Sequence, residues 1–204
     1  MTCGMVSDVL DHLAAGFVGP ASWMPPRGLR TEPILGRIRT LIAADQYLGI
    51  PPVETQEWTD WWCSLKPGEI VWVKGSMDWA FWGELCSVTA LKVGLAATVV
   101  DGLTRDTRRV AELGYPVFSR GYSGRDIDGR GCVVALDSDA PTDGGIVRTG
   151  DWVFLDWDGV AVIYGDRAEK VVEEVRVKAD AEEALSVRIQ DAADLGEVLQ
   201  EARI

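Results

Sequence analysis

The chain contains little that could bind zinc or form a disulfide framework. Among its 204 residues there is one histidine, His12, and there are four cysteines. The cysteines are scattered, with no CxxC pair, at Cys3, Cys63, Cys86 and Cys132. This composition argues against a structural zinc site and predicts free thiols, which are typical of a reducing compartment. A Cys–His nucleophile pair stays open, although small core residues and one surface imidazole explain these side chains more simply.

Basic residues and long apolar runs are also scarce. The 20 Lys and Arg residues are outnumbered by 32 Asp and Glu residues, which gives a formal net charge of −12. Such a surface repels a polyanion, so we expect no nucleic-acid partner. No apolar stretch reaches the roughly 18 residues that span a bilayer, and the start MTCGMVSDVLDHL lacks a basic segment followed by an apolar one. We therefore expect a cytoplasmic protein with no membrane partner.

What is present is typical of one globular domain. The apolar content is 47% and the charged content 25%, and 204 residues suffice for one well-buried core. Alternation predicts a strand over 34–43, and further strands and helices alternate after it. The strands cover 70–73, 95–100 and 115–119, and the helices cover 83–93 and a segment from Asp106 or Thr104 to Gly114, after a turn at Asp101 and Gly102. This βαβαβ order favours parallel strands with right-handed crossovers.

A helix over 54–65 is predicted by large apolar residues at i, i+3, i+4 and i+7. These residues are Trp58, Trp61, Trp62 and Leu65. A core or subunit-contact stripe is the preferred interpretation, and a tryptophan-lined ligand site is the alternative. In the helix over 83–93 and the residues after it, we expect Leu85, Val88 and Leu95 to point inward.

Both ends of the chain are expected to be helical. Ser7 can cap a helix over 8–15 that Gly16 stops. After short, mixed or antiparallel strands at 132–136, 146–148, 152–156 and 160–163, Asp166 and Glu169 resemble a capping box that opens a helix to about Leu185. A last helix covers 191–202. Because residues 166–204 have few large apolar side chains, we expect this extension to pack on a neighbouring subunit.

The segment from Gly83 to Asp106 carries the best candidate site. Gly83 precedes a predicted helix, whose free N–H groups can hold a carboxylate or phosphate oxygen. Arg105 and Asp106 follow the next predicted strand, and ligands in α/β sheets collect at the carboxyl ends of strands. Arg105 can bind a carboxylate bidentately, and Asp106 offers a hard oxygen to Mg²⁺ or Mn²⁺. The alternatives are a surface ion pair, a simple N-cap at Asp106 and a simple turn at Gly83.

The chain resembles the RraA-like family, which includes class II 4-hydroxy-4-methyl-2-oxoglutarate aldolases and regulators of ribonuclease E. The resemblance is carried by SDVLDHL, ILGRIRT, the run 68–106, GYSGRDIDGRG at 121–131 and GGIVRTGDWVFLDWDGVAVI at 144–163. It implies a single α/β domain, an αββα sandwich of the swivelling β/β/α type, in place of a doubly wound sheet. It also implies a homotrimer or homohexamer with active sites between subunits.

The resemblance implies a role for each residue of the candidate site. The backbone amides of Gly83, Glu84, Leu85 and Cys86 hold the oxygens of pyruvate. Arg105 binds the pyruvyl group, and Asp106 positions the divalent metal, Mg²⁺ or Mn²⁺.

Acidic residues complete the implied site. Glu84 stands where the family has an acid near the metal, and Glu182 matches an acid that comes from the C-terminal helix of a neighbouring subunit, with Glu183 as the alternative. The chain departs from the family in the loop GSMDW, where a glycine-rich run is expected. Trp79 and Trp82 are bulky for the cleft, so they either belong to the core or narrow the pocket for a different acyl acceptor.

The implied activity is metal-dependent cleavage of a 4-hydroxy-2-oxo acid to pyruvate and a carbonyl product, with oxaloacetate decarboxylation as a side reaction. The alternative is a non-catalytic regulator that binds a ribonuclease of the E type. Such regulators tend to lack the acid that follows the arginine, whereas this chain has both Arg105 and Asp106. A phosphohistidine carrier is disfavoured because His12, its only candidate, has no glycine-rich motif beside it.

Overall fold

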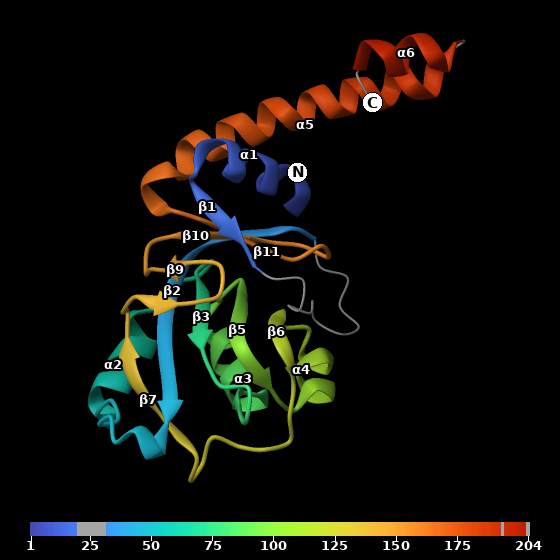
Figure 1. The fold of residues 1–204 in the computed structure, drawn as a ribbon. Coiled ribbons are helices and arrows are strands. Elements are labelled where there is room, and N and C mark those ends of the chain that lie inside the picture. The colour runs from blue at the N-terminus through green and yellow to red at the C-terminus, as the bar shows by residue number, and fades with distance from the viewer. Residues whose placement is uncertain (20–31, 193, 203–204) are drawn as a thin grey trace.

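One long strand, β2 (Ile34–Asp45), links two halves of a continuous sheet. A computed structural model of the chain describes residues 1–19, 32–192 and 194–202. The first residues of β2 pair antiparallel with β10 (Trp152–Leu155), and the next ones pair parallel with β3 (Ile70–Lys74). Figure 1 shows β2 running from the antiparallel strands into the parallel ones. The strand predicted over 34–43 is therefore confirmed.

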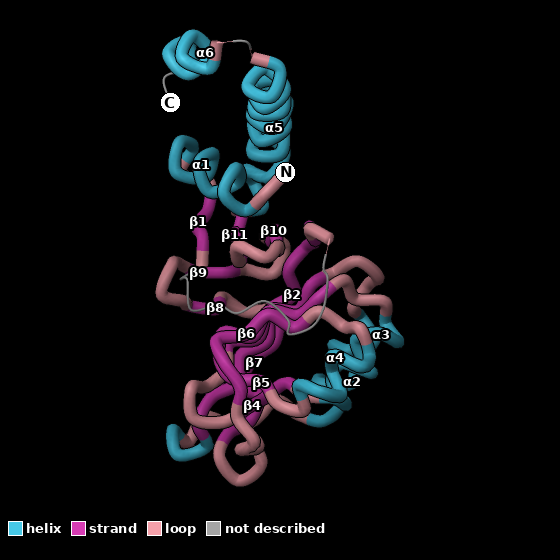
Figure 2. Tube along the Cα trace, turned by 90° about the vertical axis from the view of Figure 1, so that its right-hand side faces the viewer, coloured by secondary structure: helices cyan, strands magenta, loops and turns pink. Residues whose placement is uncertain are grey.

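The parallel half of the sheet is built around β5 (Ala97–Thr104). This strand lies between β3 and β6 (Val117–Tyr122), and a short strand, β4 (Ala80–Trp82), continues along the same edge of β5 as β3. Three helices lie together on one side of these strands (Figure 2). They are α2 (Thr55–Ser64), α3 (Glu84–Val93) and α4 (Thr107–Leu113). The predicted parallel βαβαβ arrangement is confirmed, with β4 as a strand inside a segment expected to be a loop.

The antiparallel half contains most of the short C-terminal strands. Its order is β1 (Gly16–Val18), β11 (Val160–Ile163), β10 and then β2. The remaining elements are β7 (Gly131–Leu136), which pairs antiparallel with the end of β2, the hairpin of β8 (Ala140–Pro141) and β9 (Ile146–Val147), and the 3₁₀ turns η1 (Gln46–Leu48) and η2 (Gly165–Arg167). The prediction of antiparallel strands after residue 131 is confirmed.

Two terminal helices cover the antiparallel half. α1 (Cys3–Leu13) and α5 (Ala168–Asp191) pack on each other and on β11, with Val6, Leu10 and Val171 in a shared core. The buried residues of α5 all lie between Ala168 and Val175, and its second half extends beyond the sheet toward α6 (Leu195–Ala202), as Figure 1 shows. No helix among the described residues is long and apolar enough to cross a membrane.

The ends of these helices differ from the predicted ones. α1 begins at Cys3 because the Thr2 side chain accepts a hydrogen bond from the Met5 N–H, so Ser7 lies inside the helix. It ends at Ala14, whose φ of 47° is left-handed, and Gly16 starts β1. The predicted capping box is wrong, because Asp166 lies in η2 and α5 starts at Ala168 without a side-chain cap.

The turn predicted at Asp101 and Gly102 is also wrong, because both residues lie inside β5. Gly102 has a φ of 159°, and an added Cβ would lie 2.8 Å from backbone atoms of Ser76. A glycine therefore lets the strand continue past a close backbone neighbour, with a shift in its pairing to β6. The longer β5 carries Asp101 into the interior and moves the end of the strand to Thr104.

Helix α3 faces the sheet with small residues. Its buried side chains are those of Ser87 and Ala90, whereas Leu85 is 80% exposed and Val88 is 46% exposed. The inward orientation predicted for Leu85 and Val88 is therefore wrong, although Leu95 is buried as expected. Small inward residues allow the helix to approach the sheet closely.

The tryptophan stripe of α2 belongs to the core. Trp61 and Leu65 are buried, and Trp58 and Trp62 pack against the same cluster. The rings of Trp58 and Trp61 stack with centroids 5.8 Å apart, and Trp62 contacts Trp82. The preferred interpretation of a core stripe is confirmed, because these rings fill the space between α2 and the parallel strands.

Candidate active site at the ends of β4 and β5

The two predicted polar clusters lie side by side. Trp82, the last residue of β4, is the register partner of Thr104, the last residue of β5. The Trp82 carbonyl oxygen accepts hydrogen bonds from the Arg105 N–H at 2.9 Å and from the Thr104 hydroxyl at 2.7 Å. Gly83 and Arg105 therefore leave the sheet together, and the helices α3 and α4 begin next to each other.

Asp106 connects the two clusters. Its Oδ2 accepts a hydrogen bond from the Glu84 N–H at 3.1 Å, at the first turn of α3. Asp106 itself has a φ of 55° and makes no side-chain cap for α4. The interpretation of Asp106 as a simple N-cap of its own helix is therefore wrong, because the carboxylate caps the neighbouring helix instead.

Gly83 is required by this approach. A Cβ on Gly83 would lie 2.4 Å from the Asp106 Oδ2 and 3.0 Å from the Arg105 Cγ. Contacts this short force the carboxylate or the arginine to move, so no larger residue fits without changing the site. The glycine serves packing of the functional side chains rather than a turn with positive φ.

Arg105 lies between two carboxylates. Its Nε is 3.5 Å from the Asp106 Oδ2, and its Nη1 is 2.9 Å from the Asp126 Oδ2. The three side chains are one third to two fifths exposed, at 33%, 39% and 38% for Arg105, Asp106 and Asp126. Asp126 was given no role from the sequence. The only signal for it is its place in GYSGRDIDGRG, one of the segments that resemble the family.

Glu84 is turned toward α4. Its Oε1 lies 3.2 Å from the Nη2 of Arg109, and Arg109 also pairs with Glu112 at 2.8 Å. These side chains are largely exposed to water, so the pairs are weak and can exchange for other partners. Glu84 is thus at the site, next to Asp106 through its backbone, with a carboxylate that an arginine holds at the surface.

The Cys86 thiol lies at the same end of α3 but is not suited to nucleophilic attack. Burial raises the pKa of the Cys86 thiol to about 11, so the thiolate is scarce near neutral pH. His12 lies on α1, which Figure 1 shows at the opposite end of the molecule from α3. A Cys–His nucleophile pair is therefore excluded for Cys86 within one chain, and the roles predicted for the Leu85 and Cys86 amides stay predictions.

A pocket opens beside the arginine and the aspartate. It has a volume of about 300 Å³ and is lined by Thr104, Arg105, Asp106, Thr107, Tyr122, Ser123 and Gly124. Trp82 is fully buried and its Nε1 donates to the Ser87 hydroxyl, and the 2% exposed Trp79 donates to Asp45. Both tryptophans therefore belong to the core, and neither lines this pocket.

Glu182 is not brought to this site within one chain. It lies on α5, where its Oε1 is 3.5 Å from the Lys178 Nζ, and Lys178 also pairs with Asp8 at 2.8 Å. Figure 1 and Figure 2 show α5 at the far end of the molecule from α3 and α4, and Glu183 lies on the same helix. Either glutamate can reach an Arg105–Asp106 pair only on a different subunit.

The residues present suit a hydrated hard cation. Among the described residues, no group of three His, Cys, Asp or Glu side chains is placed to hold a metal ion. Asp106 Oδ2 is engaged by the Glu84 N–H, and no described residue donates to its Oδ1. Mg²⁺ commonly binds through one or two carboxylates and keeps several waters or substrate oxygens, so one free aspartate oxygen beside a pocket fits it.

The sequence profile of the RraA-like family, whose description is Aldolase/RraA, matches residues 6–162. The chain belongs to the RraA-like family. This confirms the resemblance found in the sequence, and the mixed α/β sandwich is the fold of that family.

Individual relatives extend this assignment. The chain is 31% identical over 193 residues to "Putative 4-hydroxy-4-methyl-2-oxoglutarate aldolase" of Halalkalibacterium halodurans, a match that covers 93% of this chain and 84% of the relative. It is 34% identical over 131 residues to protein DlpA of Legionella pneumophila, covering 63% of this chain but spanning only 20% of the length of DlpA.

A solved structure supports the fold. RraAS2 of Streptomyces coelicolor, an unusual member of the RNase ES inhibitor RraA protein family, superposes with a TM-score of 0.76 at 24% identity, covering 90% of each chain. At this identity the similarity establishes the architecture, and the chemistry must be argued from the site.

Proposed function

We propose that this RraA-like protein is a divalent-metal-dependent aldolase that cleaves a 4-hydroxy-2-oxo acid to pyruvate and a carbonyl product. The observation that carries the proposal is that Arg105 and Asp106 line one pocket while the Asp106 carboxylate also holds the Glu84 N–H at the start of α3, which itself does not line that pocket. A guanidinium and free helix N–H groups suit the carboxylate of an oxo acid, and a carboxylate with a free oxygen suits Mg²⁺ or Mn²⁺. The halodurans relative, named for such an activity, supports the same reaction class.

The residues act on a substrate that carries a carboxylate next to a ketone. Arg105 binds this carboxylate through the N–H groups that its two acidic partners leave free, and the Leu85 and Cys86 N–H groups donate hydrogen bonds to the neighbouring oxygen. Asp106 would hold Mg²⁺ or Mn²⁺, and such a Lewis acid would supply stabilisation of negative charge on the substrate.

Proton transfer completes the reaction. A water held by Glu84, or by Glu182 of a neighbouring subunit, takes the proton from the C4 hydroxyl as the bond between C3 and C4 breaks. The electron pair moves into the C2–C3 unit to give the enolate of pyruvate, and the same glutamate returns the proton, through the water, to C3. Decarboxylation of oxaloacetate gives the same enolate, so we expect it as a side reaction.

A coupled assay tests this function. Pyruvate release is followed with lactate dehydrogenase and NADH, with 4-hydroxy-4-methyl-2-oxoglutarate and oxaloacetate as substrates, in Mg²⁺, in Mn²⁺ and in EDTA. We expect turnover that EDTA abolishes and that Arg105→Ala strongly reduces. Turnover in EDTA equal to that in Mg²⁺, or full activity of the variant, contradicts the proposal.

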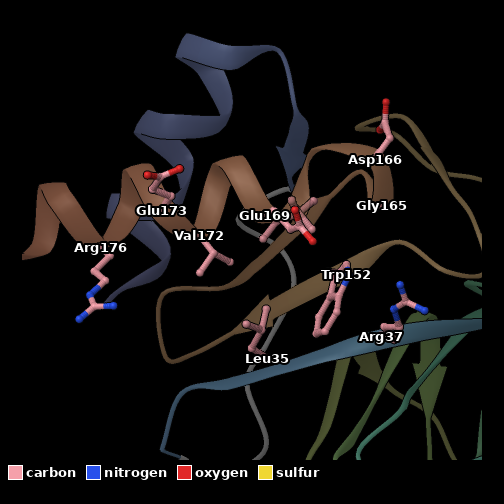
Figure 3. Close-up of a pocket in the computed structure, with 11 residues that line it drawn as sticks. Leu35, Arg37, Trp152, Gly165, Asp166, Glu169, Val172, Glu173 and Arg176 are labelled. Carbon is pink, nitrogen blue, oxygen red and sulfur yellow. The ribbon is translucent and has the colours of Figure 1, made fainter.

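We also propose that the protein is a homotrimer or a pair of trimers in which the part of α5 beyond Val175, together with α6, packs on a neighbouring subunit, while residues 168–175 stay in the core of their own chain. Figure 3 shows Val172 of α5 pointing toward Leu35, and a groove of about 820 Å³ lies between α5 and the strands that carry Leu35 and Trp152. Val177 is 66% exposed and Val187 is 52% exposed farther along the helix. Sedimentation equilibrium of the full chain and of a variant ending at 176, which keeps the buried residues of α5, tests this: we expect a trimer or hexamer that the truncation dissociates.

A second candidate function is non-catalytic binding to a ribonuclease of the E type. The name of the Streptomyces structure and the net charge of −12 favour it. The same preparation discriminates between the aldolase and the regulator. The regulator becomes the favoured function if the protein turns over no oxo acid and if both the parent and Asp106→Ala inhibit a purified ribonuclease E.

A further inference from the structure

Arg105 is held more closely by Asp126 than by Asp106. The Nη1 to Asp126 distance is 2.9 Å, whereas the Nε to Asp106 distance is 3.5 Å. Since all three side chains are partly exposed to water, neither pair contributes much to the stability of the fold. The two ion pairs instead set the orientation of the Arg105 guanidinium.

Asp126 is itself fixed in place. Its Oδ1 accepts the Ile127 N–H at 2.7 Å, and its backbone carbonyl accepts a hydrogen bond from the Arg130 side chain at 3.1 Å. The residue also forms a parallel bridge with Ala80 at the start of β4, next to the hydrogen bond from the Ala80 N–H to the Arg125 carbonyl at 2.8 Å. Asp126 is therefore a rigid anchor attached to the strand that leads into Gly83.

The two carboxylates compete for one cation. A guanidinium released from Asp126 has Asp106 as its nearest other acid, already 3.5 Å away, and a fork-like pair between them would occupy both aspartate oxygens. Asp106 would then lose the oxygen that no described residue engages, and Arg105 would lose its orientation toward the pocket. Asp126 would thus affect both substrate binding by Arg105 and metal binding by Asp106.

We propose that Asp126 is a positioning residue that holds the Arg105 guanidinium away from Asp106, so that the arginine stays free for substrate and the aspartate for the divalent metal. This inference rests on the proposed function and adds a residue that touches neither ligand. The inference concerns the orientation of the Arg105 side chain, which a crystal structure of an Asp126 variant can show directly.

The test compares Asp126→Asn with Asp128→Asn. Asp128 lies on the same loop and is exposed, and no described residue pairs with its side chain, so its variant removes an equal charge without releasing Arg105. Three measurements are made on the full-length protein: Mn²⁺ affinity by electron paramagnetic resonance of free Mn²⁺, the separate KM and kcat for 4-hydroxy-4-methyl-2-oxoglutarate, and a crystal structure of Asp126→Asn.

We expect Asp126→Asn to weaken Mn²⁺ binding and raise KM by about tenfold each, the size typical of losing a partner of a ligand residue, while Asp128→Asn stays near the parent protein. Asp126→Glu, which keeps the charge on a longer arm, should recover part of the loss. In the crystal structure of Asp126→Asn, Arg105 should pair with Asp106 through two hydrogen bonds.

Two results overturn the inference. One is equal Mn²⁺ affinity and KM in the two asparagine variants, and the other is an Arg105 side chain that keeps its orientation in the crystal structure of Asp126→Asn. Absence of turnover in the parent protein contradicts the proposed function instead, and the orientation of Arg105 then still decides whether Asp126 positions it.

Discussion

Strand β5 carries two charged clusters that are built in opposite ways. Asp101, in the middle of the strand, is 2% exposed and pairs with two cations, Lys74 at 2.8 Å and Arg120. Asp106, just beyond the end of the strand, is 39% exposed and shares one cation, Arg105, with Asp126. In the buried cluster, one carboxylate, Asp101, has two cationic partners. In the exposed cluster, two carboxylates share one cation, Arg105.

This difference separates structure from function. A buried carboxylate must be neutralised and hydrogen-bonded to be tolerated, so the Asp101 cluster uses all its groups for the fold. Asp106, by contrast, is only partly paired beside its pocket, and no described residue donates to its Oδ1. We propose that the excess of acidic charge at the end of β5 serves to bind a divalent metal.

The largest effect should come from Asp106→Ala. Loss of the carboxylate removes the proposed metal position, and we expect pyruvate release to fall by about a thousandfold while the thermal unfolding temperature changes little. The coupled assay and a thermal melt of the same sample measure both quantities. If Asp106→Ala released pyruvate at a rate within a few fold of the parent protein, the metal mechanism would be wrong.

Asp101→Ala, unlike Asp106→Ala, should mainly lower the stability of the fold. It leaves Lys74 and Arg120 without their shared acid in a mostly buried place, so we expect the free energy of unfolding to fall by about 3 kcal/mol. Urea denaturation followed by tryptophan fluorescence measures this change. A loss as small as that of Asp106→Ala would contradict the distinction between the two clusters.

Gly83→Ala should damage the exposed cluster alone. The added methyl group would lie 2.4 Å from the Asp106 Oδ2, so the carboxylate must move, and we expect kcat/KM to fall by roughly ten- to a hundredfold. Gly4→Ala is the matched control, since a Cβ there meets nothing closer than 3.8 Å inside α1. Equal kinetics for the two variants would show that the close approach is not important.

The smallest effect concerns the outer edge of the buried cluster. A hydrogen bond from Arg120 to Asp143, at 2.7 Å, lowers the pKa of the Asp143 carboxyl below its ordinary value. A lowered pKa means that this pair stabilises the fold above the pKa of the unfolded chain, and the contribution is lost as the pH falls through the folded pKa. Carboxyl NMR titration should give a midpoint below the ordinary value of 3.8 for Asp143, and replacement of Arg120 by Met should raise it.

The sequence predicted the features that depend on local pattern. Alternation located β2, a continuous apolar run located β3, and helical spacing located the tryptophan stripe of α2. The rule for the carboxyl ends of strands brought Gly83 together with Arg105. The family resemblance supplied the sandwich fold, which the βαβαβ order alone did not distinguish from a doubly wound sheet.

The features that were missed depend on contacts between distant residues. Leu85 and Val88 point outward because the small side chains of Ser87 and Ala90 let α3 approach the sheet. Side-chain hydrophobicity alone predicts the opposite face of the helix to be buried. Asp126 reaches Arg105 from a loop 21 positions later, and no periodic pattern marks such a contact. The roles of Glu84 and Glu182 at a metal centre stay predictions.

The shared strand β2 also constrains the order in which the chain can assemble. Residues 38–42 find their partner β3 within the next few dozen residues, but 34–37 must wait for β10, which begins at Trp152. On the ribosome, the parallel half with its site can therefore close while the front of β2 still offers an open edge. That open edge can pair wrongly until β10 has been made and covers it.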